Sequence, residues 1–194
     1  MKKLGLLATA ISAAVFASSV QATGTAAQAG TINITGKVVN NTCSVTSGAA
    51  TKNVKLPTVS SSQFTAEDQI VAKTQFQIGL ENCLVASANN GQTVRLFFSP
   101  ANVAAFNQAK GILNNTYTPG TGTAARNVGV AILTKNSELI PVGKDIDQYT
   151  QTGDKETLVQ GMMFLDYFAA YYSLSTSVTP GEVQASVTYS LAYD

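Results

Sequence analysis

Hydrophobic and polar residues alternate along much of this chain with the period of two that is typical of β-strands. Residues 74–83 place three apolar side chains on one face and mostly glutamine or glutamate on the other. Residues 93–99 and 127–134 are short runs rich in β-branched or aromatic residues, bounded by Asn, Gly, Ser and Pro. The pattern predicts a strand in each of these three segments.

Three further segments are less regular. Residues 162–174 are apolar on both faces, which also suits a buried helix, but their aromatic content and the nearby Gly161 favour a long buried strand. Pro141 restricts 138–142 to an edge or the end of a strand, and 100–109 is expected to hold a helical turn. Many short strands between Pro- and Gly-containing turns indicate an all-β sandwich.

Alternating segments also lie near both ends of the chain. Ile32, Ile34 and Val38 share one face of the first, and every odd position of 183–193 is apolar or aromatic in the second. From periodicity alone, the two segments either pair with each other within one chain or pair with another molecule. Both alternatives stay open at this point.

The first 22 residues have the parts of a secretory signal peptide. Two lysines follow Met1, an apolar run extends from Leu4 to Phe16, and small residues precede Ala22. The apolar run is shorter than the roughly 20 residues of a membrane-spanning helix. Cleavage after Ala22 is therefore expected, leaving residues 23–194 as a mature chain without a membrane span.

The charge balance excludes some classes of partner. Removing Lys2 and Lys3 from the 12 basic residues leaves 10 against 11 acidic residues, a net charge of −1. The mature chain has no basic cluster of the kind that binds nucleic acid or anionic membranes. Only 12% of residues are charged, so little electrostatic repulsion opposes association between copies.

Cys43 and Cys83 are the two cysteines of the chain. In an exported protein they are expected to meet an oxidising compartment and form a structural disulfide. A zinc site or a reactive thiol is a weaker alternative, because the chain has no histidine to serve as a ligand or a base.

Little in the sequence indicates catalysis or a cofactor. Without histidine, Ser-His-Asp and Cys-His nucleophiles are excluded. An acidic cluster in 145–156 has Asp145 and Asp147 but fits a calcium loop poorly, so a solvated loop is the better interpretation. The sequence GTGTAA at 120–125 matches a dinucleotide-binding pattern by letters only, because no buried strand precedes it and no helix follows. No enzyme activity, cofactor or metal is therefore predicted.

The segment 30–45 resembles the start of a mature chaperone–usher fimbrial subunit of the type 1 pilin family. In that family an alternating segment leads into the pattern G-x-V-V-x-x-x-C, here Gly36, Val38, Val39 and Cys43. The second cysteine ends the pattern F-x-I-x-L-x-x-C, formed by Phe76, Ile78, Leu80 and Cys83. A strand N-V-G-V-x-I-L at 127–133, a penultimate Tyr193 and a glycine fourteen residues from the end, Gly181, also agree.

The resemblance implies an incomplete immunoglobulin-like β-sandwich that lacks its last strand. Residues 40–194 would form the pilin domain, and residues 23–39 would form an N-terminal donor-strand extension that completes a neighbour's sheet. The matching donor positions are Gly30, Ile32, Ile34, Gly36 and Val38. The acceptor groove, which also contacts the chaperone, would be lined by Gly181, Val183, Ala185, Val187, Tyr189, Leu191 and Tyr193.

The function implied by the resemblance is that of a structural subunit of a surface fimbria that supports cell adhesion. The chain would pass through the periplasm with a chaperone, reach an outer-membrane usher and polymerise with identical or related pilin subunits by donor-strand exchange. A repeating shaft subunit is the favoured position, and a minor adapter or ligand-binding subunit is the alternative. One departure from the family pattern is the small outer part of the extension, where Ala26, Ala27 and Ala29 stand.

Overall fold

The computed structural model describes Thr35, Gly36, Val38 and residues 43–85, 91–100, 102–120, 122–151 and 153–194. The chain divides into two units, Met1–Val38 and Val39–Asp194, and the fold is that of the second. The expected signal peptide and most of the expected extension lie outside the described residues. The boundaries at Ala22 and Val39 therefore stay predictions.

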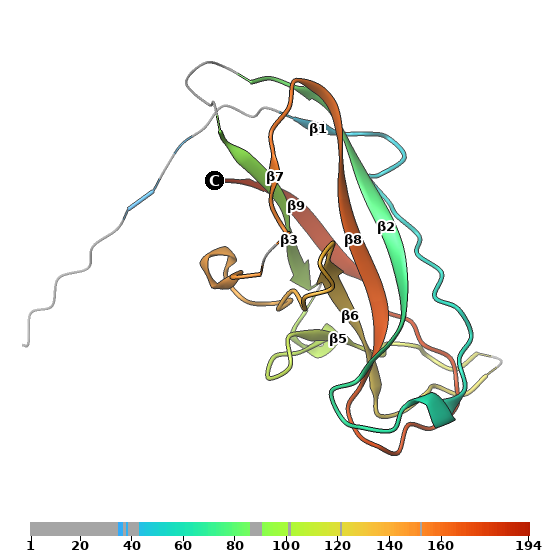
Figure 1. Cartoon of the computed structure of the whole chain (residues 1–194). Helices are drawn as coiled ribbons and strands as arrows, with labels where there is room; N and C mark the ends of the chain where they lie inside the picture. Colours follow the sequence, from blue (N-terminus) through green and yellow to red (C-terminus); the bar gives the residue numbers. More distant parts are fainter. Residues whose placement is uncertain are drawn as a thin grey trace, which may run out of the picture. The chain divides into compact units, whose positions relative to one another are not determined.

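Two antiparallel sheets make up the second unit (Figure 1). The larger sheet has the strand order β1-β2-β8-β6-β5-β4, and β2 and β8 are its two long central strands. Ten residue pairs define their register, from Ile70 opposite Tyr172 to Cys83 opposite Gly161. The bounds of its strands are β1 Ser44–Val45, β2 Ile70–Cys83, β4 Phe106–Asn107, β5 Ile112–Asn114, β6 Val128–Thr134 and β8 Gly161–Ser173.

The smaller sheet has the order β7-β3-β9, so β9 lies at one edge of it. Its strands are β3 Thr93–Pro100, β7 Glu156–Thr157 and β9 Val187–Tyr193. The described residues form no α-helix and contain three 3₁₀ turns, at Ser61–Gln63, Val103–Ala105 and Ile146–Gln148. The predicted all-β sandwich and the helical turn within 100–109 are thereby confirmed.

The main hydrophobic core takes side chains from both sheets. Ile78 and Leu80 of β2 are fully buried, as are Leu96 and Phe98 of β3 on the facing sheet. Gln75 and Gln77 of β2, on the opposite face, are exposed, as the alternation predicted. Burying each such side chain stabilises the fold by about 1.5–3 kcal/mol, which is why the period of two is kept so strictly here.

The strand β8 confirms the prediction of a strand at 162–174, but it is not buried along its whole length. Met162 is 61% exposed and Phe164 is 53% exposed, while Met163 and Leu165 on the other face are buried. The ring of Phe164 lies against Gly79 of β2, where an added Cβ would come within 3.3 Å of it. Both faces become buried only in the second half of the strand, where a second cluster covers the outer face of the sheet.

The C-terminal ladder is shorter than the alternation predicted. The segment 183–193 was expected to be one strand, whereas β9 begins at Val187, which is opposite Pro100 at the end of β3. Pro100 and Val187 form a non-hydrogen-bonded pair, so the missing N–H of the proline does not face β9 and does not account for the end of the ladder. Residues 183–186 remain extended and keep the alternation of half-buried and exposed side chains.

A β-bulge interrupts β2 between Val71 and Thr74. Ala72 within it has φ 57°, the left-handed region that L-residues avoid. Ala72 therefore adopts an unfavourable backbone conformation that glycine would adopt at lower cost.

Ala72→Gly is expected to raise the free energy of unfolding by about 0.5–1 kcal/mol. The left-handed conformation costs an L-residue about 1–2 kcal/mol, and the greater freedom of glycine in the unfolded chain offsets part of the gain. Chemical denaturation measures the change. Ala131→Gly in β6, where Ala131 is fully buried and has no positive φ, should destabilise instead; the same sign for both variants would contradict the explanation.

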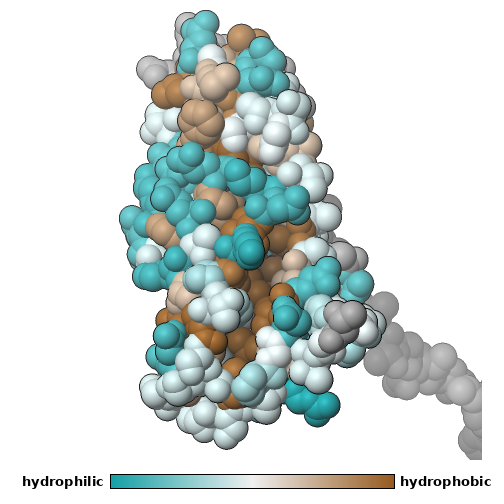
Figure 2. All heavy atoms as spheres, turned by 90° about the vertical axis from the view of Figure 1, so that its right-hand side faces the viewer, coloured by the Kyte–Doolittle hydropathy of each residue, from teal (hydrophilic) through white to brown (hydrophobic). Residues whose placement is uncertain are grey.

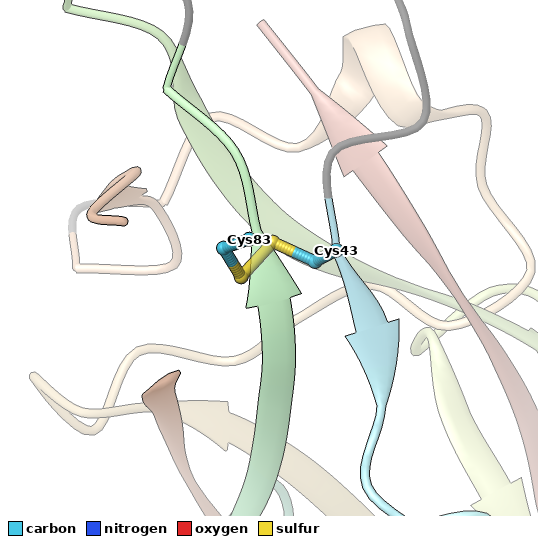
Figure 3. The surroundings of a disulfide bond; sticks show 2 residues. All are labelled: Cys43 and Cys83. Carbon is cyan, nitrogen blue, oxygen red and sulfur yellow. A yellow bond between two sulfur atoms is a disulfide. The ribbon is translucent and has the colours of Figure 1, made fainter. Parts of the chain in front are cut away.

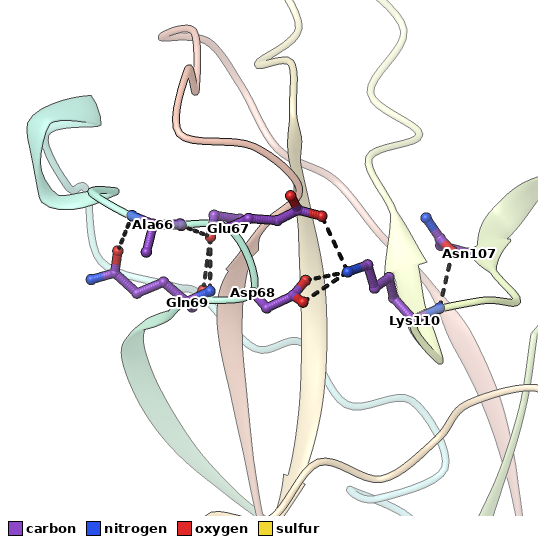
Figure 4. Close-up of polar contacts among 7 residues, drawn as sticks. Ala66, Glu67, Asp68, Gln69, Asn107 and Lys110 are labelled. Carbon is purple, nitrogen blue, oxygen red and sulfur yellow. Dashed lines mark hydrogen bonds and ion pairs between the residues drawn. The ribbon is translucent and has the colours of Figure 1, made fainter.

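An ion-pair cluster joins two turns at one end of the sandwich (Figure 4). Lys110, in the turn between β4 and β5, places its Nζ 2.6 Å from Asp68 Oδ1 and 3.2 Å from Glu67 Oε1. The hydrogen bond from Lys110 lowers the pKa of Asp68. The stabilisation from this pair is therefore present at neutral pH and is lost as the pH falls through the lowered pKa.

Lys110→Met is expected to return the pKa of Asp68 toward its ordinary value. An NMR titration of the Asp68 carboxyl carbon measures the shift directly. Lys52→Met, which removes an exposed lysine outside the cluster, serves as the control. An unchanged Asp68 titration in the Lys110 variant would show that the hydrogen bond does not set this pKa.

Candidate strand-binding groove

A hydrophobic hollow of about 1320 Å³ opens along one side of the sandwich. It lies between residues 50–59 and the C-terminal segment 178–189. Figure 2 views the molecule from the side on which residues 46–60 run in Figure 1, and it shows a hollowed hydrophobic band bordered by polar residues. We refer to this hollow as the groove.

The floor of the groove is the main core itself. Phe76 and Ile78 come from β2, Phe98 from β3, Ile132 from β6 and Ala169 from β8. Residues from both sheets thus meet beneath a single opening. The opening is elongated and lies where the two sheets leave a space that another strand could fill.

The first wall, residues 50–59, is held by side chains rather than by a ladder. Val54 and Leu56 pack against the core, and the hydroxyl of Tyr171 donates to the carbonyl of Pro57 at 3.2 Å. Within the described residues this segment makes no backbone-to-backbone hydrogen bond. Apart from the carbonyl of Pro57, its main-chain donors and acceptors are therefore available to another strand.

The second wall presents a free strand edge. Asp194 and Thr93 exchange two backbone hydrogen bonds, so the even-numbered residues of β9 bond to β3. The odd-numbered residues consequently direct their N–H and C=O groups away from β3. Their side chains point to the core, so these residues combine apolar side chains with unpaired main-chain groups.

Asn115 holds the part of this wall that has no ladder. Its Nδ2 donates to the carbonyls of Ala125 and Glu182, both at 2.9 Å. Its Oδ1 accepts from the N–H groups of Tyr117 at 3.1 Å and Gln184 at 3.0 Å. One amide side chain thereby positions the beginning of the C-terminal segment against the loop that contains the GTGTAA sequence.

A buried ion pair holds the far end of β9. Arg95 Nη1 lies 2.8 Å from Asp154 Oδ2, and its Nε lies 3.2 Å from a carboxylate oxygen of Asp194. The hydroxyl of Tyr167 donates to the carbonyl of Asp154 at 3.2 Å and accepts from the N–H of Leu96 at 2.9 Å. Burial raises the pKa of Tyr167, so this hydroxyl keeps its proton.

The residues expected to form an acceptor surface fall into two groups. Leu191 and Tyr193 pack against the core beyond the groove and do not line it. The others line the groove: Gly181, Val183, Ala185, Val187 and Tyr189. The wall at 50–59 and the role of Asn115 were not foreseen, although the alternation of Val54 and Leu56 with polar neighbours was a signal for the wall.

The expected donor positions are largely outside the described residues. Gly30, Ile32 and Ile34 are among those not described. Val38 is 99% exposed, and a Cβ on Gly36 would meet no atom within 4 Å.

The expected disulfide joins Cys43, just before β1, to Cys83 at the end of β2 (Figure 3). Both cysteines are buried. The bond closes a separation of 40 residues in sequence, for which the chain-entropy model gives about 4 kcal/mol of stabilisation. It holds β1 beside β2, where the two strands share only two residue pairs.

The acidic cluster at 145–156 has structural partners. Asp154 pairs with Arg95, and Glu156 pairs with Lys135. Asp145 begins the 3₁₀ turn Ile146–Gln148, where its N–H bonds the side chain of Gln148. Among the described residues no group of three or more candidate metal ligands occurs, and no helix is long and apolar enough to cross a membrane.

Known proteins share this architecture. The P pilus rod subunit PapA matches with a TM-score of 0.53 at 18% identity, covering 78% of this chain and 99% of PapA. A subunit in a structure of a chaperone–usher pilus matches with a TM-score of 0.55 at 21% identity, covering 86% and 96%. The fold is therefore the incomplete immunoglobulin-like sandwich of pilus subunits, as predicted.

Sequence comparison identifies the family. The family model for fimbrial protein matches residues 32–194. The chain is 34% identical over 191 residues to the F17 fimbrial protein of Escherichia coli, covering 98% of this chain and 96% of that protein. It is 33% identical over 168 residues to the major fimbrial subunit SMF-1 of Stenotrophomonas maltophilia (strain K279a), covering 85% and 92%.

This chain belongs to the fimbrial protein family. It is a structural subunit of a surface fimbria, and its family is one of structural pilins rather than of enzymes. The predicted resemblance is confirmed.

Arg95→Leu is expected to lower the free energy of unfolding by about 3–5 kcal/mol, because it leaves the carboxylate of Asp154 buried without its partner. Replacing both Arg95 and Asp154 by leucine should cost less than the single change, since no unpaired charge remains. Chemical denaturation of the two variants tests this. A double variant less stable than Arg95→Leu would contradict the explanation.

Proposed function

We propose that this subunit assembles by donor-strand exchange, with residues 23–39 of one copy filling the groove of the next. The observation that carries the proposal is the groove itself, an apolar floor between two strand edges with unpaired main-chain groups. An added strand satisfies both edges with hydrogen bonds and buries alternate side chains in the core, which is β-strand addition.

The N-terminal extension has the composition that such a strand requires. Ile32, Ile34 and Val38 supply apolar side chains on one face, and Gly30 and Gly36 supply positions without a Cβ. Gly36 suits a place where the groove floor leaves no room for a side chain. Full burial of each isoleucine contributes about 1.5–3 kcal/mol to the contact.

Each subunit gives a strand at one end and receives a strand elsewhere, so the contact is heterologous. Heterologous contacts that do not close into a ring produce a filament. The partners are therefore identical or related pilin subunits, which agrees with the weakly charged surface of the chain.

Before assembly the groove exposes core residues and needs a temporary occupant. We infer that a periplasmic chaperone supplies a strand and that an outer-membrane usher exchanges it for the next subunit's extension. The relevant support is the signal peptide expected at residues 1–22, which directs the chain to export, and the similarity to chaperone–usher pilus subunits.

Expression of the chain without a chaperone is expected to give an aggregated or degraded product. Fusing a second copy of residues 23–39 after Asp194 should give a soluble monomer with cooperative unfolding, because the added strand can fill the groove. Size-exclusion chromatography and thermal unfolding measure both outcomes.

The matched control is the same fusion with Ile32→Asp and Ile34→Asp in the added copy. A buried aspartate without a partner opposes insertion, so this fusion should aggregate like the unfused chain. A stable monomer formed by the unfused chain without a chaperone, or equal rescue by the control fusion, would exclude the donor-strand proposal.

A further inference from the structure

The groove ends abruptly at Tyr189. Its C-terminal wall runs from Val178 to Tyr189, although the alternation of apolar residues continues to Leu191 and Tyr193. Both of these residues pack against the core but lie outside the hollow. Something therefore closes the space between the two sheets from Tyr189 onward.

The closing element is the turn that follows β1. Thr46 donates its N–H to the carbonyl of Gly79 at 3.0 Å, which is the last backbone bond from this segment to the edge of β2. Ala49 then donates its N–H to the carbonyl of Thr46 at 2.9 Å, forming a tight turn. Ala49 is 4% exposed. Ala49 thus anchors the turn in the core, whereas Ser47 and Gly48 at its tip are exposed.

One hydrogen bond joins this turn to the opposite wall. The hydroxyl of Tyr189 donates to the carbonyl of Ala49 at 2.5 Å. The two residues belong to different walls, 140 positions apart in sequence. Their contact spans the groove near this end, and most lining residues of the two walls lie on one side of it, Ala50 to Val59 and Val178 to Thr188; Val45 of β1 lies on the other side.

We propose that the Tyr189–Ala49 bridge is a stop that fixes the register of the strand received in the groove. This proposal rests on the donor-strand function proposed above. A slip of one residue turns apolar side chains outward and is strongly disfavoured, but a slip of two residues keeps the apolar face inward. Main-chain hydrogen bonds can form both in the correct register and in the register shifted by two residues. A steric end to the groove therefore selects between these two registers.

The number of alternate positions in the C-terminal wall equals the number in the donor segment, as expected for a groove with a closed end. Alternate positions from Gly181 to Tyr189 number five, and alternate positions from Gly30 to Val38 also number five. An open groove extending to Tyr193 would offer seven, leaving room for the strand to slide. The bridge removes the two extra positions, Leu191 and Tyr193.

Disulfide trapping measures the register. The protein is the full chain with Ile32→Asp and Ile34→Asp, so that its own extension does not compete for the groove. It is refolded with an excess of a synthetic peptide of residues 28–40. In this peptide Thr35 is replaced by cysteine. A single cysteine is placed in turn at the exposed wall positions Ser186, Thr188 and Ser190. The yield of peptide-to-protein disulfide at each position reports which residue faces Thr35 of the peptide.

With Tyr189 intact, one of the three positions is expected to dominate. In Tyr189→Phe the ring remains but the bridge is lost, so the position two residues nearer the C-terminus should gain yield relative to the dominant one. The expected gain in that ratio is about threefold or more, the factor for losing one hydrogen bond of ordinary strength.

Tyr171→Phe is the matched control, because it removes another tyrosine-to-carbonyl hydrogen bond to the same wall, at Pro57. It should keep the single register. A single register in Tyr189→Phe, two registers with Tyr189 intact, or equal slippage in Tyr171→Phe would each overturn the stop. Absence of trapping at all three positions in every variant would instead overturn the donor-strand function itself.

Discussion

The structure depends on main-chain pairing that the described part of the chain leaves unmade. Two chain segments, residues 50–59 and the C-terminal segment, face each other across exposed core, and most of the main-chain groups of the first and those of the odd-numbered residues of β9 have no main-chain partner. Buried main-chain groups are costly without partners, and exposed edges invite pairing with other chains. The donor-strand proposal rests on this opening, because a strand from another subunit would supply the missing pairing.

The walls of the groove stay in place because polar side chains substitute for ladders. Asn115 holds the start of the C-terminal segment, Arg95 holds its end, and Tyr189 connects it to the opposite wall. Each of these side chains bonds a backbone carbonyl, a backbone N–H or a carboxylate. Such bonds are directional, so each one fixes the position of the wall segment that it contacts, which nonspecific hydrophobic contact would not do. Under the donor-strand proposal, walls fixed in this way would lose little conformational entropy on binding a strand.

The alternation of apolar residues was sufficient to predict most of the fold. It located β2, β3, β6 and β9 and favoured a strand over a helix at 162–174, because side-chain direction in a strand depends on local sequence alone. It missed the start of β9, because the extent of a ladder also depends on the length of the partner strand, here β3. It also missed the exposure of Met162 and Phe164, because burial depends on which elements cover a face.

The site was predictable only on one side. Alternation marked the C-terminal wall from Gly181 to Tyr189, and the resemblance to pilins supplied its role. The function of Asn115 depends on partners 10 and 67 residues away, and the bridge from Tyr189 to Ala49 crosses 140 residues. Such contacts follow from topology, which no local pattern contains. The disulfide would have a mechanical consequence in the proposed fibre. Only four residues separate Val38 from Cys43, so tension on a strand donated as proposed would pass through a covalent bond into β2 instead of peeling away the two-residue strand β1.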